Sequence, residues 1–167
     1  KDPGEAGKLA GSFKNNRTLY REHLHFALQE MLKNPLAAPE KTAVIGFCFG
    51  GTGAIELARS GANIKAAVSF HGGLDSPSPQ DGKNIKAKVL ALHGADDPFV
   101  KAVDLKAFEE EMKTNNVDYK LIQYPGAVHS FTDKTAGNDN SKGAAYNESA
   151  DQKSWIAMKD LFSTLFK

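Results

Sequence analysis

Residues 41–60 read KTAVIGFCFGGTGAIELARS, and this stretch decides the fold. Residues 41–47 are short, apolar and partly β-branched, which predicts a buried strand. Residues 51–60 predict a helix, which ends where Gly61 takes the usual C-terminal position. The turn between them, GFCFGG, is tight, so its central Cys48 is expected to have strained dihedral angles and to project over the edge of the sheet.

The alternation of strand and helix continues along the chain. Helical spacing of apolar residues predicts further helices over residues 17–33, 103–115 and 148–167. Short apolar runs predict further strands over residues 65–70, 88–93 and 118–124. We expect a loosely ordered leading segment over residues 1–16 and a surface loop over residues 75–84. Because no hairpin turn joins the strands, the pattern predicts an α/β fold with a mostly parallel sheet and helices on both faces.

The composition excludes several classes of protein. A chain of 167 residues with 41% hydrophobic and 25% charged residues is typical of one soluble globular domain. Lys and Arg number 21 against 20 Asp and Glu, so there is no basic excess for binding nucleic acid. No apolar run approaches the ~20 residues of a membrane helix, and no membrane partner is expected. The single cysteine excludes an intramolecular disulfide and a multi-thiolate metal site, and we expect neither a metal nor a cofactor.

Cys48 is the first candidate for a chemical role. The backbone N–H of Phe49, at the start of the predicted helix, is placed to stabilise an oxyanion, and the helix dipole favours a thiolate. A lone cysteine is more often a buried structural residue, but the strand before, the helix after and the flanking glycines favour a nucleophile. A dinucleotide-binding loop is rejected, because a G-x-G-x-x-G motif from Gly51 and Gly53 would need glycine where Glu56 stands.

A cysteine nucleophile needs a base and a group that orients the base. His129 follows the last of the predicted strands, at the carboxyl edge where open parallel sheets bind ligands. The loop GADDPFV of residues 94–100 follows the preceding strand and reaches the same edge. Nucleophile, acid and base therefore occur in the chain order of α/β-hydrolases. Three other histidines, His23, His25 and His93, are expected in surface, packing or structural roles. His71 is considered below.

The chain resembles the dienelactone hydrolase family, a cysteine-nucleophile branch of the α/β-hydrolase fold. Three motifs, each after a predicted strand, carry the resemblance: GFCFGG at residues 46–51, GADDPFV at 94–100 and VHSF at 128–131. The resemblance covers residues 42–131, which is most of the chain. The three motifs in this order are far more specific than the cysteine turn alone.

The resemblance implies hydrolysis of a small ester or lactone through a catalytic triad of Cys48, Asp97 and His129. In this mechanism the thiolate attacks the carbonyl, a thioacyl-enzyme forms, and water activated by the histidine releases the acid. Asp97 is expected to hold the imidazole, and Asp96, the alternative acid, to be a solvated or turn-capping carboxylate. A small ester or lactone is then the expected partner of the chain.

Three further residues are candidates to bind the substrate: His71, Phe99 and Phe131. His71 directly follows a predicted strand, and the two aromatic residues lie in the acid and histidine loops. An alternative function is that of a non-catalytic relative, which keeps the fold and an exposed thiol for ligand binding or redox sensing.

The sequence departs from the family's pattern before its nucleophile strand. A full α/β-hydrolase has several strands there, whereas residues 1–40 predict one helix. We therefore expect residues 1–167 to be the C-terminal half of a single α/β-hydrolase domain that lacks its first strands. The loop that supplies the second oxyanion-hole donor in the family would be missing too. The compartment and the oligomeric state stay open.

Overall fold

The computed structural model describes residues 2–167, so that Lys1 lies outside the described residues. Within this range, one parallel sheet has the strand order β1-β2-β3-β4. Its strands are β1 (Ala43–Phe47), β2 (Ala66–Phe70), β3 (Lys88–Gly94) and β4 (Tyr119–Tyr124). The helices are α1 (Pro3–Asn15), α2 (Arg17–Leu32), α3 (Phe49–Arg59), α4 (Ala102–Thr114) and α5 (Glu148–Leu165). Short 3₁₀ turns are η1 (Pro39–Lys41), η2 (Pro79–Asn84), η3 (Lys134–Ala136) and η4 (Asn140–Lys142).

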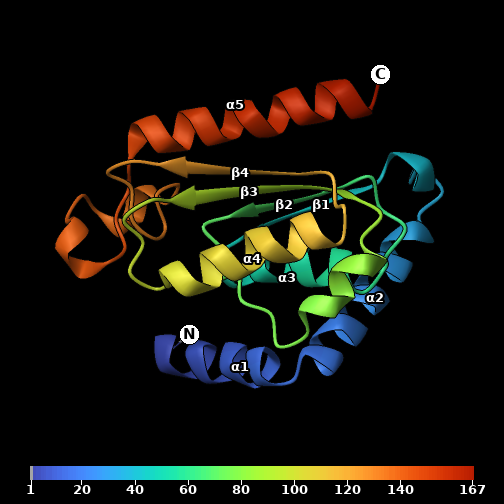
Figure 1. The fold of residues 1–167 in the computed structure, drawn as a ribbon, viewed down its shortest axis with the longest axis horizontal. Coiled ribbons are helices and arrows are strands. Elements are labelled where there is room, and N and C mark those ends of the chain that lie inside the picture. The colour runs from blue at the N-terminus through green and yellow to red at the C-terminus, as the bar shows by residue number, and fades with distance from the viewer. Residues whose placement is uncertain (1) are drawn as a thin grey trace.

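Helices cover both faces of the sheet, as the sequence predicts. Figure 1 shows α5 on one face and α1 to α4 on the other. In β2, Val68 and Phe70 pack in a cluster with Met158 of α5, whereas Ala67 packs with Leu57 of α3. Every residue of β2 is buried, which explains why this strand shows no alternation of polar and apolar residues.

The loosely ordered segment expected at the N-terminus is instead largely the helix α1, so that prediction is wrong. Asp2 is its N-cap and accepts a hydrogen bond from the N–H of Gly4 at 2.9 Å. At its other end, the Phe13 ring lies 5.5 Å from the ring of Tyr20 in α2. Capping and packing against α2 thus outweigh the low helix propensity of glycine. The loop predicted at residues 75–84 likewise contains η2.

A buried ionic cluster joins α3 to α2 and α4. Glu56 accepts hydrogen bonds from Arg17 at 3.3 Å and from Arg59 at 2.9 Å. Arg59, which is 0% exposed, also donates to both carboxylate oxygens of Glu111, at 2.9 and 2.6 Å. Two backbone carbonyls at 3.1 Å complete its hydrogen bonds. We call these four residues the arginine–glutamate network.

The outer edge of β1 pairs with no other strand among residues 2–167. On this edge strand Ile45 and Phe47 are 44% and 41% exposed, on the face that α5 covers further along the sheet. No helix in the described part of the chain is both long and apolar enough to cross a lipid bilayer. Since all strands run in the same direction, their carboxyl ends lie at one edge, where the candidate site is built.

Candidate active site

Each strand of the sheet supplies one residue of the candidate site at its carboxyl end. Cys48 directly follows β1, and His71 directly follows β2. Asp97 and His129 lie in the loops after β3 and β4. We call Cys48, His71, Asp97 and His129 the reactive cluster. The parallel register brings together residues that are up to 81 positions apart, the separation of Cys48 from His129.

The turn at Cys48 has the strained geometry expected of it. The residue has φ 51° and ψ −119°, and it forms the N-cap position of α3. A side chain at Gly46 would overlap the backbone of Gly50, and one at Gly51 would come within 2.7 Å of the Ser69 hydroxyl. Gly50 itself has open space around it. Gly46 and Gly51 are therefore the glycines that the turn requires.

The Cys48 sulfur is half-buried among three polar side chains. It lies 3.4 Å from Nδ1 of His71 and 3.5 Å from the hydroxyl of Ser130. It is also within 4.8 Å of a ring nitrogen of His129. Burial raises the pKa of this thiol, but the polar groups around it, His129 foremost, favour the thiolate more strongly and lower the pKa to about 5.

His129 is held by the acid that the motif comparison favours. Its Nδ1 donates a hydrogen bond to Asp97 at 2.9 Å, and the N–H of Phe99 donates to the same carboxylate at 2.8 Å. Burial lowers the pKa of His129, but Asp97 and the Cys48 thiolate raise it to about 9. Burial raises the pKa of Asp97, and the bonds from His129 and Phe99 lower it below its usual value. Asp96 instead accepts a hydrogen bond from the N–H of Gly126 at 3.1 Å.

His71 is closer to the sulfur than a pocket wall would need to be. Its ring is 2% exposed, and Nδ1 accepts a hydrogen bond from the backbone N–H of Cys48 at 3.3 Å. Because a backbone N–H can only donate, the proton of the neutral ring lies on Nε2. That nitrogen donates to the hydroxyl of Thr132 at 2.8 Å.

Backbone strain gathers at this site. Among residues 2–167, the non-glycine residues with positive φ are Cys48, His71, Asn116 and Ser130. All but Asn116 belong to the immediate surroundings of the sulfur. Such conformations are costly and persist where the surrounding structure enforces them, most often at functional sites.

The two aromatic candidates lie in different places. Phe99 is 64% exposed, and its ring stands edge-on to His129 with 5.4 Å between the ring centroids. Phe131 is fully buried in the core cluster under α5 and packs edge-on against His71 at 4.9 Å. Phe99 thus borders the open side of the reactive cluster, and Phe131 supports it from behind. That His71, Phe99 and Phe131 bind substrate stays a prediction.

Sequence reasoning missed Tyr20, which supports the turn from α2. Its hydroxyl donates to the backbone carbonyl of Phe49 at 2.9 Å, and the two rings stack at 4.6 Å. A side chain at Gly53 would collide with the Tyr20 hydroxyl, so Gly53 is the one sign in the sequence that another group packs closely here. The contact fixes the first residue of α3, whose N–H is the predicted oxyanion donor.

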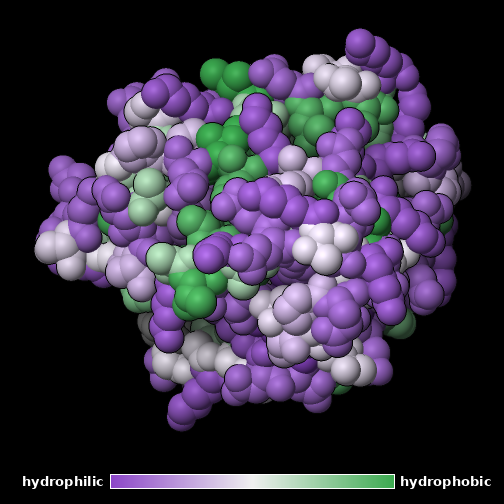
Figure 2. Space-filling model, in the orientation of Figure 1, coloured by the Kyte–Doolittle hydropathy of each residue, from purple (hydrophilic) through white to green (hydrophobic). Residues whose placement is uncertain are grey.

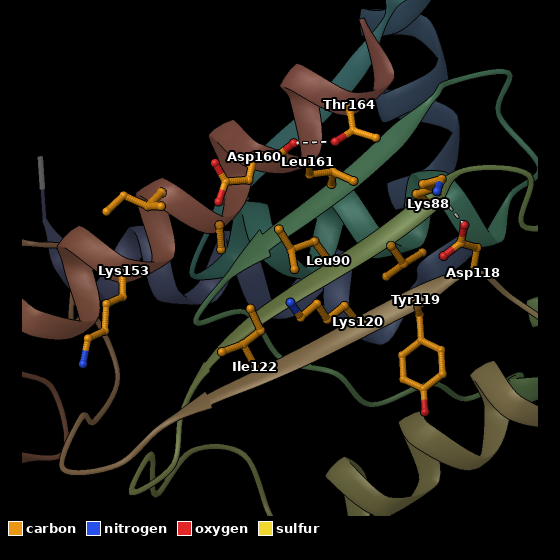
Figure 3. A pocket seen from close by; sticks show the side chains of 13 residues that line it. Lys88, Leu90, Asp118, Tyr119, Lys120, Ile122, Lys153, Asp160, Leu161 and Thr164 are labelled. Atoms are coloured by element: carbon orange, nitrogen blue, oxygen red, sulfur yellow. Dashed lines mark hydrogen bonds and ion pairs between the residues drawn. The ribbon is translucent and has the colours of Figure 1, made fainter.

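A groove of about 440 Å³ lies away from the reactive cluster, between α5 and the first halves of β3 and β4. Figure 3 shows Lys88, Asp118 and Lys120 at the strands and Lys153 and Asp160 on α5. Figure 2 shows hydrophobic atoms gathered beneath α5 amid a mostly hydrophilic surface. No cysteine or histidine lines the groove, which therefore offers no nucleophile of the kind found at the sheet edge.

Three comparisons relate the chain to known proteins. The model of the dienelactone hydrolase family matches residues 1–166. The crystal structure of a dienelactone hydrolase-like promiscuous phosphotriesterase, P91 from metagenomic libraries, is 40% identical with a TM-score of 0.93. The match covers 99% of this chain and 70% of P91. The uncharacterized protein K02A2.1 of Caenorhabditis elegans is 31% identical over 87% of this chain and 94% of its own length.

A protein of Synechocystis sp. that carries the provisional name carboxymethylenebutenolidase is 30% identical over 80% of this chain. The match covers 54% of that relative, and the chain likewise spans about half the length of the relatives with the same provisional name in Yersinia pestis and Salmonella typhimurium. The fold of P91 extends over the whole described chain, and with it the α/β-hydrolase architecture predicted from the sequence is confirmed. The chain belongs to the dienelactone hydrolase family.

Proposed function

We propose that this protein hydrolyses small carboxylic esters or lactones with Cys48 as nucleophile, His129 as acid and base, and Asp97 as the orienting acid. One observation carries the proposal: a half-buried sulfur lies within 4.8 Å of an imidazole whose other nitrogen is bonded to a buried carboxylate at 2.9 Å. This is the arrangement that nucleophilic acyl transfer requires. Membership of the dienelactone hydrolase family supports the same class of substrate.

In the first half-reaction, His129 holds the proton of Cys48, and the thiolate attacks the carbonyl carbon. A C–S bond forms, and the negative charge moves to the carbonyl oxygen, toward the N–H of Phe49. The imidazolium of His129 then protonates the departing alkoxide as the C–O bond breaks. With a lactone, the alcohol released in this step stays attached to the acyl group.

In the second half-reaction, neutral His129 takes a proton from a water molecule. The water oxygen attacks the thioacyl carbon, and the C–S bond breaks to give the free acid and the Cys48 thiolate. Asp97 keeps the imidazole in one tautomer through both steps. Because the pKa of Cys48 is about 5 and that of His129 about 9, the resting pair is charged across the neutral range.

The test is steady-state hydrolysis of p-nitrophenyl acetate and of a small lactone. We expect Cys48→Ala and His129→Ala to lower kcat by on the order of 10⁴–10⁶-fold. His25→Ala is the matched control, since this histidine lies on α2 and contacts Ser60 instead. Intact mass spectrometry should detect an acetyl adduct on Cys48 in the wild type and in His25→Ala, and none in Cys48→Ala. Equal turnover by all four proteins would overturn the proposal. Given the likeness to P91, the panel also includes an aryl phosphotriester.

A thiol sensor is the second candidate function, and the low pKa of the half-buried Cys48 favours it. Peroxide treatment distinguishes the two. A sensor forms a sulfenic acid at Cys48 rapidly and hydrolyses none of the substrates. A hydrolase turns over the ester and is inactivated by the same oxidation.

A further inference from the structure

The second imidazole at the sulfur has no role in the reaction proposed above. Acyl transfer needs one base, and His129 with Asp97 fulfils that role. Yet His71 also lies beside the Cys48 sulfur, at 3.4 Å, and has its own side-chain partner in Thr132. A buried histidine at positive φ is costly to keep, so its position beside the nucleophile needs a reason.

The three side chains place their donor atoms close together. Nδ1 of His71 carries a lone pair, because the ring proton of the neutral form lies on Nε2 toward Thr132, and a metal ion would take this lone pair from the Cys48 N–H, which donates to it at 3.3 Å. Nδ1–H of His129 faces Asp97, which leaves Nε2 free when the ring is neutral. With the Cys48 sulfur, one nitrogen of each ring lies in a set whose members are within 4.8 Å of one another.

We propose that Cys48, His71 and His129 bind one divalent transition-metal cation of the zinc class, which blocks the nucleophile reversibly. This goes beyond the expectation from the sequence, where the single cysteine argued against a metal. One thiolate and two imidazoles are a ligand set that zinc and its neighbours prefer. Three protein ligands leave the fourth position to a water molecule, on the side bordered by the exposed Phe99.

The distances fit such a site with small movements. Donors bound to one tetrahedral zinc ion lie about 3.3–3.6 Å apart. Cys48 and His71 already have this separation, at 3.4 Å. His129, at most 4.8 Å from the other two, needs to approach by no more than roughly 1 Å, which rotation of side chains at the half-buried sulfur provides.

Both imidazoles have the outer partners that zinc-bound histidines usually have. Asp97 accepts from the far nitrogen of His129, and Thr132 accepts from the far nitrogen of His71. Such partners fix the tautomer and the ring orientation of the ligand. Binding would release the thiol proton to solvent if the cysteine is protonated, and it involves no change of oxidation state.

The experiment uses Co²⁺ as a spectroscopic probe on the full chain after treatment with a chelator. We expect one Co²⁺ per chain and a sulfur-to-cobalt charge-transfer band that added Zn²⁺ abolishes. Cys48→Ala should remove the band. His71→Asn should weaken binding strongly, and asparagine suits this site because it tolerates positive φ better than most residues. Thr132→Val should weaken binding by roughly 10–100-fold.

His25→Asn is the matched control and should leave Co²⁺ binding unchanged. Unchanged binding by folded His71→Asn would overturn the proposal, as would a band that survives in Cys48→Ala. If His71→Asn does not fold, wild-type protein alkylated at Cys48 with iodoacetamide replaces it, and retained binding would again refute the site. These readouts need no hydrolysis, so failure of the metal site and failure of the proposed activity are separate results. In active protein, Zn²⁺ should inhibit turnover, and EDTA should restore it.

Discussion

The reactive cluster and the arginine–glutamate network both hold ionisable side chains away from water, but their hydrogen bonds are completed to different degrees. In the network, Arg59 donates five hydrogen bonds, to Glu56, to Glu111 and to two backbone carbonyls. In the reactive cluster, the Cys48 sulfur has longer contacts, of 3.4 and 3.5 Å to His71 and Ser130 and within 4.8 Å to His129.

This difference separates stability from reactivity. A buried charge whose partners are complete is held rigidly and has no electron pair left for chemistry. A thiolate with long, incomplete contacts keeps its nucleophilic electron pairs, and its polar neighbours, His129 foremost, favour the ionised form. Substitutions in the two regions should therefore affect different measurements.

The largest expected effect is loss of turnover without loss of stability, on replacing the orienting acid. Asp97→Asn should lower kcat by about 10⁴-fold, because the amide no longer fixes the His129 tautomer. Steady-state kinetics with p-nitrophenyl acetate measures the loss. Asp96→Asn is the matched control, because that carboxylate bonds to Gly126 instead. A larger loss of kcat from Asp96→Asn than from Asp97→Asn would show that Asp97 is not the orienting acid.

The next effect is loss of stability, on breaking the network. Arg59→Met should lower the free energy of unfolding by about 3–5 kcal/mol, since it leaves Glu111 buried without its ion-pair partner and removes one of the partners of Glu56. Lys88→Met breaks an exposed ion pair with Asp118 and should cost less than about 1 kcal/mol. Urea unfolding followed by circular dichroism measures both. Similar losses would mean that the network contributes no more than a surface pair.

The same contrast explains what could be predicted from the sequence. The turn at Cys48 was predictable because strand, glycines and helix are adjacent in the chain. His129 and the loop with Asp96 and Asp97 were predicted at the site because parallel strands deliver their following loops to one edge, and the resemblance to the family selected Asp97. The network was not predictable, because Arg59 and Glu111 are 52 residues apart and no local pattern links them.

Other details depended on orientations that a sequence does not display. Ser130 and His71 both have a positive φ, and this backbone conformation accompanies the contact of each side chain with the sulfur. The sequence gives no sign of these dihedral angles. His93, for which the sequence predicted a structural role, is buried with no hydrogen-bond partner for its Nδ1 among the described residues, and burial lowers its pKa. Helix α1 was missed because composition was weighed above the capping by Asp2.

A smaller effect should connect the two regions through Tyr20. Tyr20→Phe removes the hydrogen bond to the Phe49 carbonyl and should cost about 1 kcal/mol of stability. Because this bond positions the start of α3, kcat should also fall several-fold while the burst of acyl-enzyme persists. Tyr119→Phe is the control, since its ring packs edge-on against Phe108 of α4, far from the turn. An unchanged kcat would limit Tyr20 to a structural role.

The smallest effect should be a shift in the ionisation of Cys48 on removing the Ser130 hydroxyl. The thiolate is lost as pH falls through the pKa of the folded protein, so the rate of alkylation by iodoacetamide in wild type, with chelator present, should halve near pH 5. A hydrogen bond of about 1 kcal/mol corresponds to less than one pH unit. Ser130→Ala should therefore move the midpoint upward by that amount, and Ser130→Gly, which suits the positive φ, should agree with it.

Ser163→Ala, on the exposed face of α5, should leave the midpoint in place. A downward shift in either Ser130 variant would show that the hydroxyl accepts a hydrogen bond from the thiol rather than donating one to the thiolate.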